Sequence, residues 1–219
     1  MDWGLLSIVV VGAGLVVGWA ASRLLAAAAG PAPVPAGPCA VGTGVLWGVV
    51  CVLAQRGALP PWWVPVPLAA TAFAVPLALA DLRHRRLPDV LTLPSYVLGA
   101  VAVGAAALGG PGPPLVATAV VGGLATLGAH VLLHRLAPAS LGAGDVKLSG
   151  SLGLLAGAAG WPTLVAVMVL ASAVTAVLAG AAIVRRGLRW RDGVPHGPGL
   201  LAATCVGVLF PGGLPSVGS

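Results

Sequence analysis

The sequence is poor in charge. Only 7% of its 219 residues are charged, glutamate is absent, and lysine occurs once, at Lys147. Soluble domains carry a charge on about a quarter of their residues. The low charge, the mean hydropathy of +1.04 and the apolar runs that recur along the chain exclude an ordinary soluble enzyme. They predict a protein that crosses a membrane several times.

Residues that bind metals or form disulfides are also scarce. The three cysteines show no CxxC spacing, so we expect small apolar packing residues and neither a disulfide framework nor a zinc site: Cys39, Cys51 and Cys205. Three histidines form no metal-binding pattern with the carboxylates: His84, His130 and His134. We therefore expect no metal and no other cofactor.

The residues that are abundant predict an all-α fold. An Ala/Leu/Val background with 33 glycines is typical of closely packed helices in lipid, and the alternation of a β-barrel strand is not found. We expect one membrane domain over residues 1–219, without a soluble domain, and about eight spans. The expected spans are residues 5–27, 40–55, 63–80, 90–108, 115–134, 146–160, 162–184 and 197–212. The sixth is short enough to re-enter the membrane instead of crossing it.

The positions of the basic residues predict an orientation. With eight spans, every Arg and Lys except Arg56 falls on one side, whereas seven spans would scatter them. Basic residues mark the cytoplasmic side, so we expect a multi-pass protein of a bacterial inner membrane with both termini outside. The net charge of +6 then indicates contact with anionic lipids and not with nucleic acid. Trp62, Trp63 and Trp161 fall at expected outer boundaries, as in an aromatic belt.

The five aspartates are the only carboxylate side chains: Asp2, Asp81, Asp89, Asp145 and Asp192. Asp2 lies at the N-terminus, and Asp192 lies in the turn-like stretch "RWRDGVP", so we expect loop positions for both. Asp89 follows Pro88 and precedes an apolar run. This pattern predicts the N-cap of the fourth span, with Pro88 ending the third.

Asp81 and Asp145 lie at the edges of apolar runs, and the topology puts them at the same membrane depth. Two close carboxylates do not both ionise readily, so one can activate a water while the other polarises a peptide carbonyl. Gly142 and Gly144 would let backbone or substrate approach Asp145. The alternatives are a structural ion pair, a helix cap, or a coupling-ion site in a transporter.

Three segments resemble one known family. They are "DLRHRRLPDVLTLP" at 81–94, "GAGDVKL" at 142–148 and "VPHGPGL" at 194–200. In this order, within a membrane protein, they are similar to the type IV prepilin peptidases, whose second motif is GxGD. The resemblance covers about residues 64–212, which would be the catalytic core.

The resemblance implies a GxGD-type aspartic endopeptidase with Asp81 and Asp145 as its catalytic pair. Its partner would be a type IV prepilin, a pseudopilin or a tight-adherence pilin. It would remove the short basic leader at the cytoplasmic membrane face, commonly after a glycine. Supporting roles would fall to the residues around the two aspartates: Gly142, Gly144, Lys147, Pro88 and Asp89. Lys147 would lower a carboxylate pKa or bind a substrate carbonyl, unless it only anchors the topology. The oligomeric state is not predicted.

Two features depart from the family pattern: a missing domain and one substituted residue. Many members carry a domain with two CxxC pairs between the first two spans, which helps to methylate the new N-terminus. Only "AGPAPVPAGPCAVG" stands there in this chain, so we expect cleavage without methylation. His196 occupies a position where phenylalanine is usual, either as a tolerated loop substitution or as a pH-sensitive contact near the site.

Two other classes of protein remain as alternatives. A presenilin-like GxGD protease would have Tyr-Asp within a span, whereas Asp81 follows Ala80 and leads into a basic loop. A transporter would show internal repeats and polar residues at mid-membrane, and no convincing repeat is found. A non-enzymatic assembly factor of a pilus or secretion system would tolerate loss of either aspartate.

Overall fold

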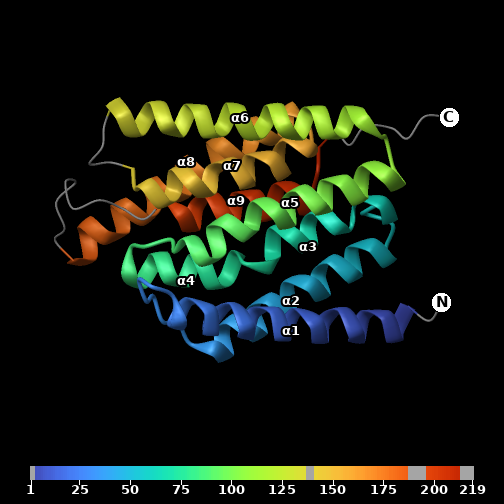
Figure 1. Ribbon diagram of the computed structural model, residues 1–219, viewed down its shortest axis with the longest axis horizontal. Coiled ribbons are helices and arrows are strands. Elements are labelled where there is room, and N and C mark those ends of the chain that lie inside the picture. The colour runs from blue at the N-terminus through green and yellow to red at the C-terminus, as the bar shows by residue number, and fades with distance from the viewer. Residues whose placement is uncertain (1–2, 137–140, 187–195, 213–219) are drawn as a thin grey trace.

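The computed structural model describes residues 3–136, 141–186 and 196–212 as an elongated helical bundle without strands in those ranges (Figure 1). Its elements are α1 Trp3–Ala27, α2 Ala36–Gln55, the 3-10 helix η1 Pro61–Trp63, α3 Pro65–Ala72, α4 Ala74–His84, α5 Asp89–Gly109, α6 Pro113–Leu136, α7 Ala143–Ala158, α8 Trp161–Arg186 and α9 Gly197–Leu209. The predicted all-α fold is confirmed.

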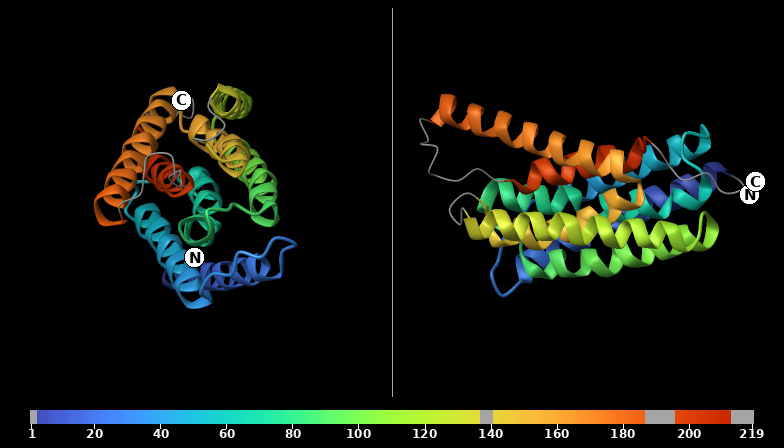
Figure 2. Two further views of the ribbon diagram at one scale, coloured as in Figure 1. Left: turned by 90° about the vertical axis from the view of Figure 1, so that its left-hand side faces the viewer. Right: turned by 90° about the horizontal axis from the view of Figure 1, so that it is seen from above.

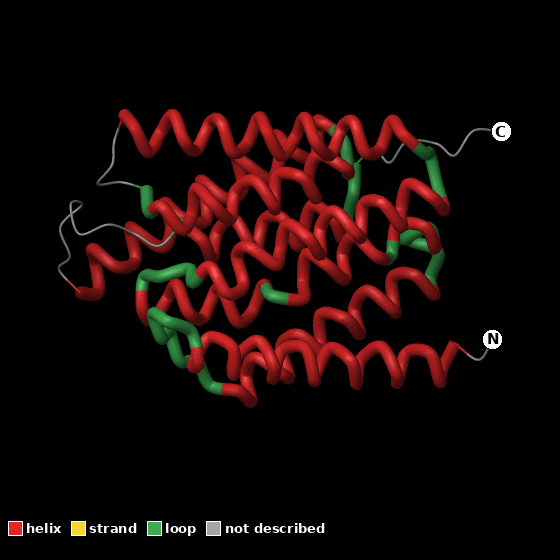
Figure 3. The backbone as a smooth tube through the Cα atoms, viewed as in Figure 1, coloured by secondary structure: helices red, strands yellow, loops and turns green. Residues whose placement is uncertain are grey.

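Helices suit this sequence because backbone surrounded by lipid must satisfy its own hydrogen bonds. Within the described ranges, six helical stretches are long and apolar enough to cross a membrane: α1, α2, α5, α6, α8 and the combined stretch Pro61–His84. Their outward faces carry exposed apolar side chains such as Ile8, Val97, Leu124 and Val169. Figure 3 shows these helices joined by short connections. The protein is therefore a polytopic membrane bundle.

Two shorter helices occupy the interior. Most residues of α7 and α9 are buried, and α9 packs against α3, α4, α7 and α8. Seen along the bundle, the longer helices surround α9 (Figure 2). Both inner helices are shorter than the roughly 20 residues that a perpendicular crossing needs, so the count of eight spans stays a prediction.

The third expected span is two helices. The chain breaks at Phe73, between α3 and α4. Pro76 has no backbone N–H to donate to the carbonyl of Ala72, so a helix that continued through this point would lose one backbone hydrogen bond. Proline is tolerated in the first turn of a helix, where it stands in α4. The helix also extends beyond residue 80, to His84, which places Asp81 inside α4.

Trp63 does not belong to an aromatic belt. Its side chain is fully buried, and its indole Nε1–H donates a hydrogen bond to the carbonyl of Val208, 2.9 Å away. A buried indole needs such an acceptor. Trp63 therefore joins η1 to the end of α9 and does not face lipid. Its expected place in an aromatic belt was wrong, whereas its depth at the outer boundary stays a prediction.

We expect Gly18→Ala in α1 to destabilise the bundle. A Cβ at Gly18 would overlap the backbone carbonyl of Cys39 in α2, and overpacking of this kind typically costs about 1–3 kcal/mol. Thermal unfolding of the detergent-solubilised protein measures the effect. Gly12→Ala in the same helix is the matched control, because a Cβ there meets nothing within 4 Å. Equal melting temperatures for the two variants would contradict the observed α1–α2 packing.

Candidate active site

Helix α4 carries Asp81 into the interior near one end of the bundle. Asp81 lies one turn before the end of the helix, and its backbone carbonyl accepts a hydrogen bond from Arg85 N at 2.8 Å. Arg85 ends α4 in the left-handed conformation, with φ of 51°. The chain then turns away towards α5, while the Asp81 side chain stays only 4% exposed.

Helix α7 carries Asp145 in its first turn. Gly142 is the N-cap residue, in an extended conformation, and α7 begins at Ala143. Asp145 is 7% exposed. A negative charge is favoured at this end of a helix because the first backbone N–H groups lack partners inside the helix.

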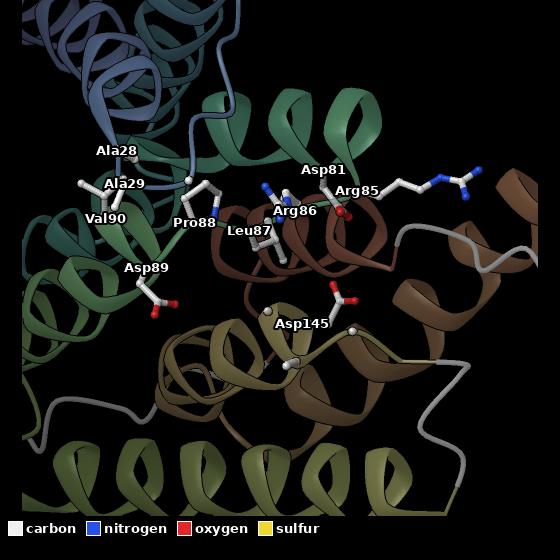
Figure 4. Close-up of a pocket in the computed structure, with 14 residues that line it drawn as sticks. Ala28, Ala29, Asp81, Arg85, Arg86, Leu87, Pro88, Asp89, Val90 and Asp145 are labelled. Atoms are coloured by element: carbon white, nitrogen blue, oxygen red, sulfur yellow. The ribbon is translucent and has the colours of Figure 1, made fainter.

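The two carboxylates converge at the beginning of α9. Figure 4 shows them pointing toward one another from α4 and α7. A Cβ built on Gly197 would lie 2.7 Å from Asp81 Oδ2 and 3.3 Å from Asp145 Oδ1. Since one point is this close to both oxygens, the two side chains are near enough to hold one water molecule between them. Glycine at position 197 leaves the necessary space.

Each carboxylate has an oxygen without a well-placed partner. Within the described part of the chain, Asp81 Oδ2 and Asp145 Oδ1 are buried and have no partner in good hydrogen-bond geometry, although the backbone of Gly197 approaches both carboxyl groups. A buried acceptor of this kind is costly, and two close carboxylates resist simultaneous ionisation. The pair is therefore suited to sharing a proton and binding a water or a peptide. Lys147, which the sequence left open as an ion-pair partner of Asp81, pairs with Asp89 instead.

A cavity of about 600 Å³ opens onto the pair. Its walls come from the beginning of the α1–α2 connection, the link between α4 and α5, and the start of α7. They are formed by Ala28, Ala29, Gly30, Asp81, Arg85, Arg86, Leu87, Pro88, Asp89, Val90, Gly142, Ala143, Gly144 and Asp145. The cavity is large enough for several residues of an extended peptide.

The two glycines before Asp145 serve different contacts. A Cβ at Gly144 would lie 2.9 Å from the Cβ of Leu87, so this glycine lets the α4–α5 link pack against α7. A Cβ at Gly142 would lie 3.2 Å from Asp145 Oδ2. The GxGD glycines thus allow the close approaches around Asp145 that their small size predicts.

Lys147 and Asp89 pair with each other at the cavity mouth. Lys147 Nζ lies 2.8 Å from Asp89 Oδ2, with side chains 48% and 53% exposed. Lys147 thus contacts neither aspartate of the pair. The N-cap of α5 is Pro88, and Asp89 is the first helical residue, whose carboxylate accepts hydrogen bonds from Lys147 Nζ and Thr92 Oγ1. The expected N-cap was therefore wrong by one residue, because Pro88 already supplies the extended conformation.

Sequence reasoning missed two residues that shape the site. Gly197 lies against both carboxylates, and Leu87 Cδ1 would lie 3.2 Å from a Cβ at Gly197. The segment "VPHGPGL" pointed to the start of α9, but nothing in it showed that its first glycine faces Asp81. Asp192 lies outside the described residues, as does Asp2.

The described residues contain no group of three or more His, Cys, Asp or Glu side chains that could hold a metal ion. The cysteines are free thiols. That the protein needs no metal or other cofactor stays a prediction.

The comparisons with known proteins place the chain in a family. The model of the type IV leader peptidase family matches residues 68–180, slightly more than half of the chain, and this range includes both aspartates. No curated protein and no solved structure matches the chain. The resemblance found in the motifs is thereby confirmed, and peptidase is the class of activity that the family indicates. The chain belongs to the type IV leader peptidase family.

Proposed function

We propose that the protein is an aspartic endopeptidase that removes the short basic leader of a type IV prepilin or a prepilin-like protein. The observation that carries the proposal is the pair of buried carboxylates that meet at Gly197 and border a cavity of about 600 Å³. Asp81 and Asp145 are the proposed catalytic residues.

The reaction needs one ionised and one protonated carboxyl group. The ionised carboxylate takes a proton from the water held between the pair, and the water oxygen attacks the scissile carbonyl carbon. The protonated carboxyl donates a hydrogen bond to the carbonyl oxygen, on which negative charge develops. Collapse of the tetrahedral intermediate breaks the C–N bond, and a carboxyl proton passes to the leaving amine.

The cavity would open at the cytoplasmic face of a bacterial inner membrane. Arg83, Arg85 and Arg86 lie beside Asp81 at this end of the bundle, and Arg56 follows α2 at the other end. Basic residues mark the cytoplasmic side. The described N-terminus of α1 and the end of α9 lie away from the site, which supports termini outside the cell.

We further propose cleavage without methylation. Residues 28–35 connect α1 and α2, and Ala28, Ala29 and Gly30 border the cavity. The family members that methylate carry their CxxC domain at this place. The chain has no CxxC pair anywhere.

The test is cleavage in membranes. The protein is co-expressed in turn with a type IV prepilin, a tight-adherence prepilin and a pseudopilin. We expect at least one substrate to shift to the mature size, and mass spectrometry should find a new N-terminus without an added methyl group. A substrate in which valine replaces the glycine before the scissile bond is the control and should stay uncut.

Two outcomes would contradict the proposal. If no substrate of any class is cut, the assignment as a leader peptidase fails. If the substrate is cut and the product is methylated, only the absence of methylation is wrong.

A further inference from the structure

His196 immediately precedes the glycine that faces both carboxylates. It lies at the N-cap position of α9, and its side chain points toward α8 and α6. Its Nδ1 lies 2.8 Å from Thr175 Oγ1 in α8, and its ring centroid lies 5.7 Å from that of His130 in α6. His196 therefore contacts two neighbouring helices at the point where α9 begins.

The hydrogen-bond chain fixes the role of each atom. Thr175 Oγ1 lies 2.8 Å from the carbonyl of Ala171 and 2.8 Å from His196 Nδ1. A hydroxyl has one proton, and a carbonyl only accepts. Both contacts are hydrogen bonds only if Thr175 donates to Ala171 and His196 Nδ1–H donates to Thr175. His196 is thus a donor that is tied to α8.

The first turn of α9 lies very close to the same two atoms. A Cβ at Gly199 would lie 2.8 Å from the carbonyl oxygen of Ala171 and 2.8 Å from Thr175 Oγ1. Gly199 lets α9 approach α8, and the His196 hydrogen bond adds a directional contact at the same place. Gly197 lies between His196 and Gly199 in the chain. Its position relative to the carboxylates therefore depends on how α9 packs against α8.

The imidazole of His196 is neutral near pH 7. Burial and the neighbouring His130 lower its pKa to about 4. The contact with Thr175 requires a proton on Nδ1, and in a neutral ring this is the Nδ1–H tautomer. The lowered pKa thus means that His196 donates this hydrogen bond without carrying a charge across the physiological pH range.

We propose that His196 is a positioning residue for the aspartate pair: its hydrogen bond to Thr175 docks the start of α9 and sets Gly197 between Asp81 and Asp145. This inference rests on the proposed peptidase function. His196 does not border the substrate cavity, so it acts through α9 and not by touching substrate.

The experiment compares His196→Phe with His196→Asn. Phenylalanine keeps a planar ring but removes the Nδ1–H donor, whereas the asparagine amide N–H can replace that donor. We expect His196→Phe to lower kcat about fivefold, which corresponds to one ordinary hydrogen bond, with KM unchanged. His196→Asn should restore most of kcat. Melting temperatures of both variants separate a loss of positioning from a loss of stability.

Thr175→Val supplies the matched partner change, because valine has the shape of threonine without the hydroxyl. We expect the same reduction in kcat, and no further reduction in the double variant with His196→Phe, since both remove one interaction. Multiplied losses in the double variant would overturn the inference. So would wild-type kcat in His196→Phe, or failure of asparagine to improve on phenylalanine.

A second readout does not depend on a substrate. The carboxyl ¹³C signals of Asp81 and Asp145, assigned with the Asp→Asn variants, should both move in His196→Phe and return in His196→Asn. Unmoved signals would overturn the positioning role. If wild type cuts no substrate but the signals move as expected, the proposed function fails and the positioning role of His196 stands.

Discussion

Asp81→Asn and Asp145→Asn are each expected to reduce the rate of leader cleavage by at least about a thousandfold, because residues that act as one catalytic unit lose nearly all activity when either is removed. Asparagine has nearly the size of aspartate, so the cavity keeps its shape. It can neither take a proton from water nor pass one to the leaving amine. The measurement is the fraction of prepilin matured in membranes over time, at equal enzyme amounts.

The same substitutions should not weaken the fold. Asp81 Oδ2 and Asp145 Oδ1 are buried without a partner in good hydrogen-bond geometry in the described part of the chain, and like charges oppose one another. Neutralising one member removes that cost, so the melting temperature should stay the same or rise. Loss of activity together with unchanged or higher stability is the result expected of catalytic residues, and buried structural residues would lose both.

The control is Asp192→Asn, which removes a carboxylate at a residue outside the described ranges. It should mature prepilin at the wild-type rate. If either variant of the pair still cuts, the two-carboxylate mechanism is wrong. A non-enzymatic assembly role would then explain the tolerance better.

The sequence alone predicts that Asp81 lies close to Asp145, because the chain has so few carboxylates. Only five aspartates had to be explained, and counting the apolar runs placed two of them at one depth. The basic clusters supplied a second, independent constraint on the number of runs. In a chain with an ordinary charge content, many more carboxylates would compete, and the pair could not be predicted in this way.

Contacts between distant segments could not be predicted in the same way. Gly197 and Asp81 are brought together by α4 and α9, which pack directly, and no local pattern shows which face of α9 meets α4. Trp63 was misjudged for the same reason, since its indole acceptor is Val208 at the other end of the chain. The break at Phe73, by contrast, has a local signal in the sequence, because Pro76 lacks the N–H that would bond to the carbonyl of Ala72.

Close packing by small residues explains why the site can form between helix ends. Because it has no side chain, Gly144 can pack closely against Leu87 and Gly199 against Thr175. Gly197 leaves space for the two carboxylates. Each glycine removes a side chain at a point where two backbones or a backbone and a functional group approach. The site therefore depends on steric space as much as on the two acidic groups.

Gly197→Ala is accordingly expected to lower kcat by about a hundredfold or more. The new methyl group would lie 2.7 Å from Asp81 Oδ2 and 3.3 Å from Asp145 Oδ1, where the water or the scissile carbonyl must bind. A displacement of about 1 Å in a catalytic group can cost a factor of 100 in rate. Gly197 is not in the left-handed region, so alanine is compatible with its backbone and raises helix propensity.

Gly37→Ala is the matched control, because Gly37 also lies in the first turn of a helix and a Cβ there meets nothing within 4 Å. Both variants should fold and reach the membrane in equal amounts, and only Gly197→Ala should stop the maturation of prepilin. Normal activity of Gly197→Ala would mean that the two carboxylates do not work around this residue. The water and the scissile peptide would then have to bind on the side of the pair that faces Leu87 and the open cavity.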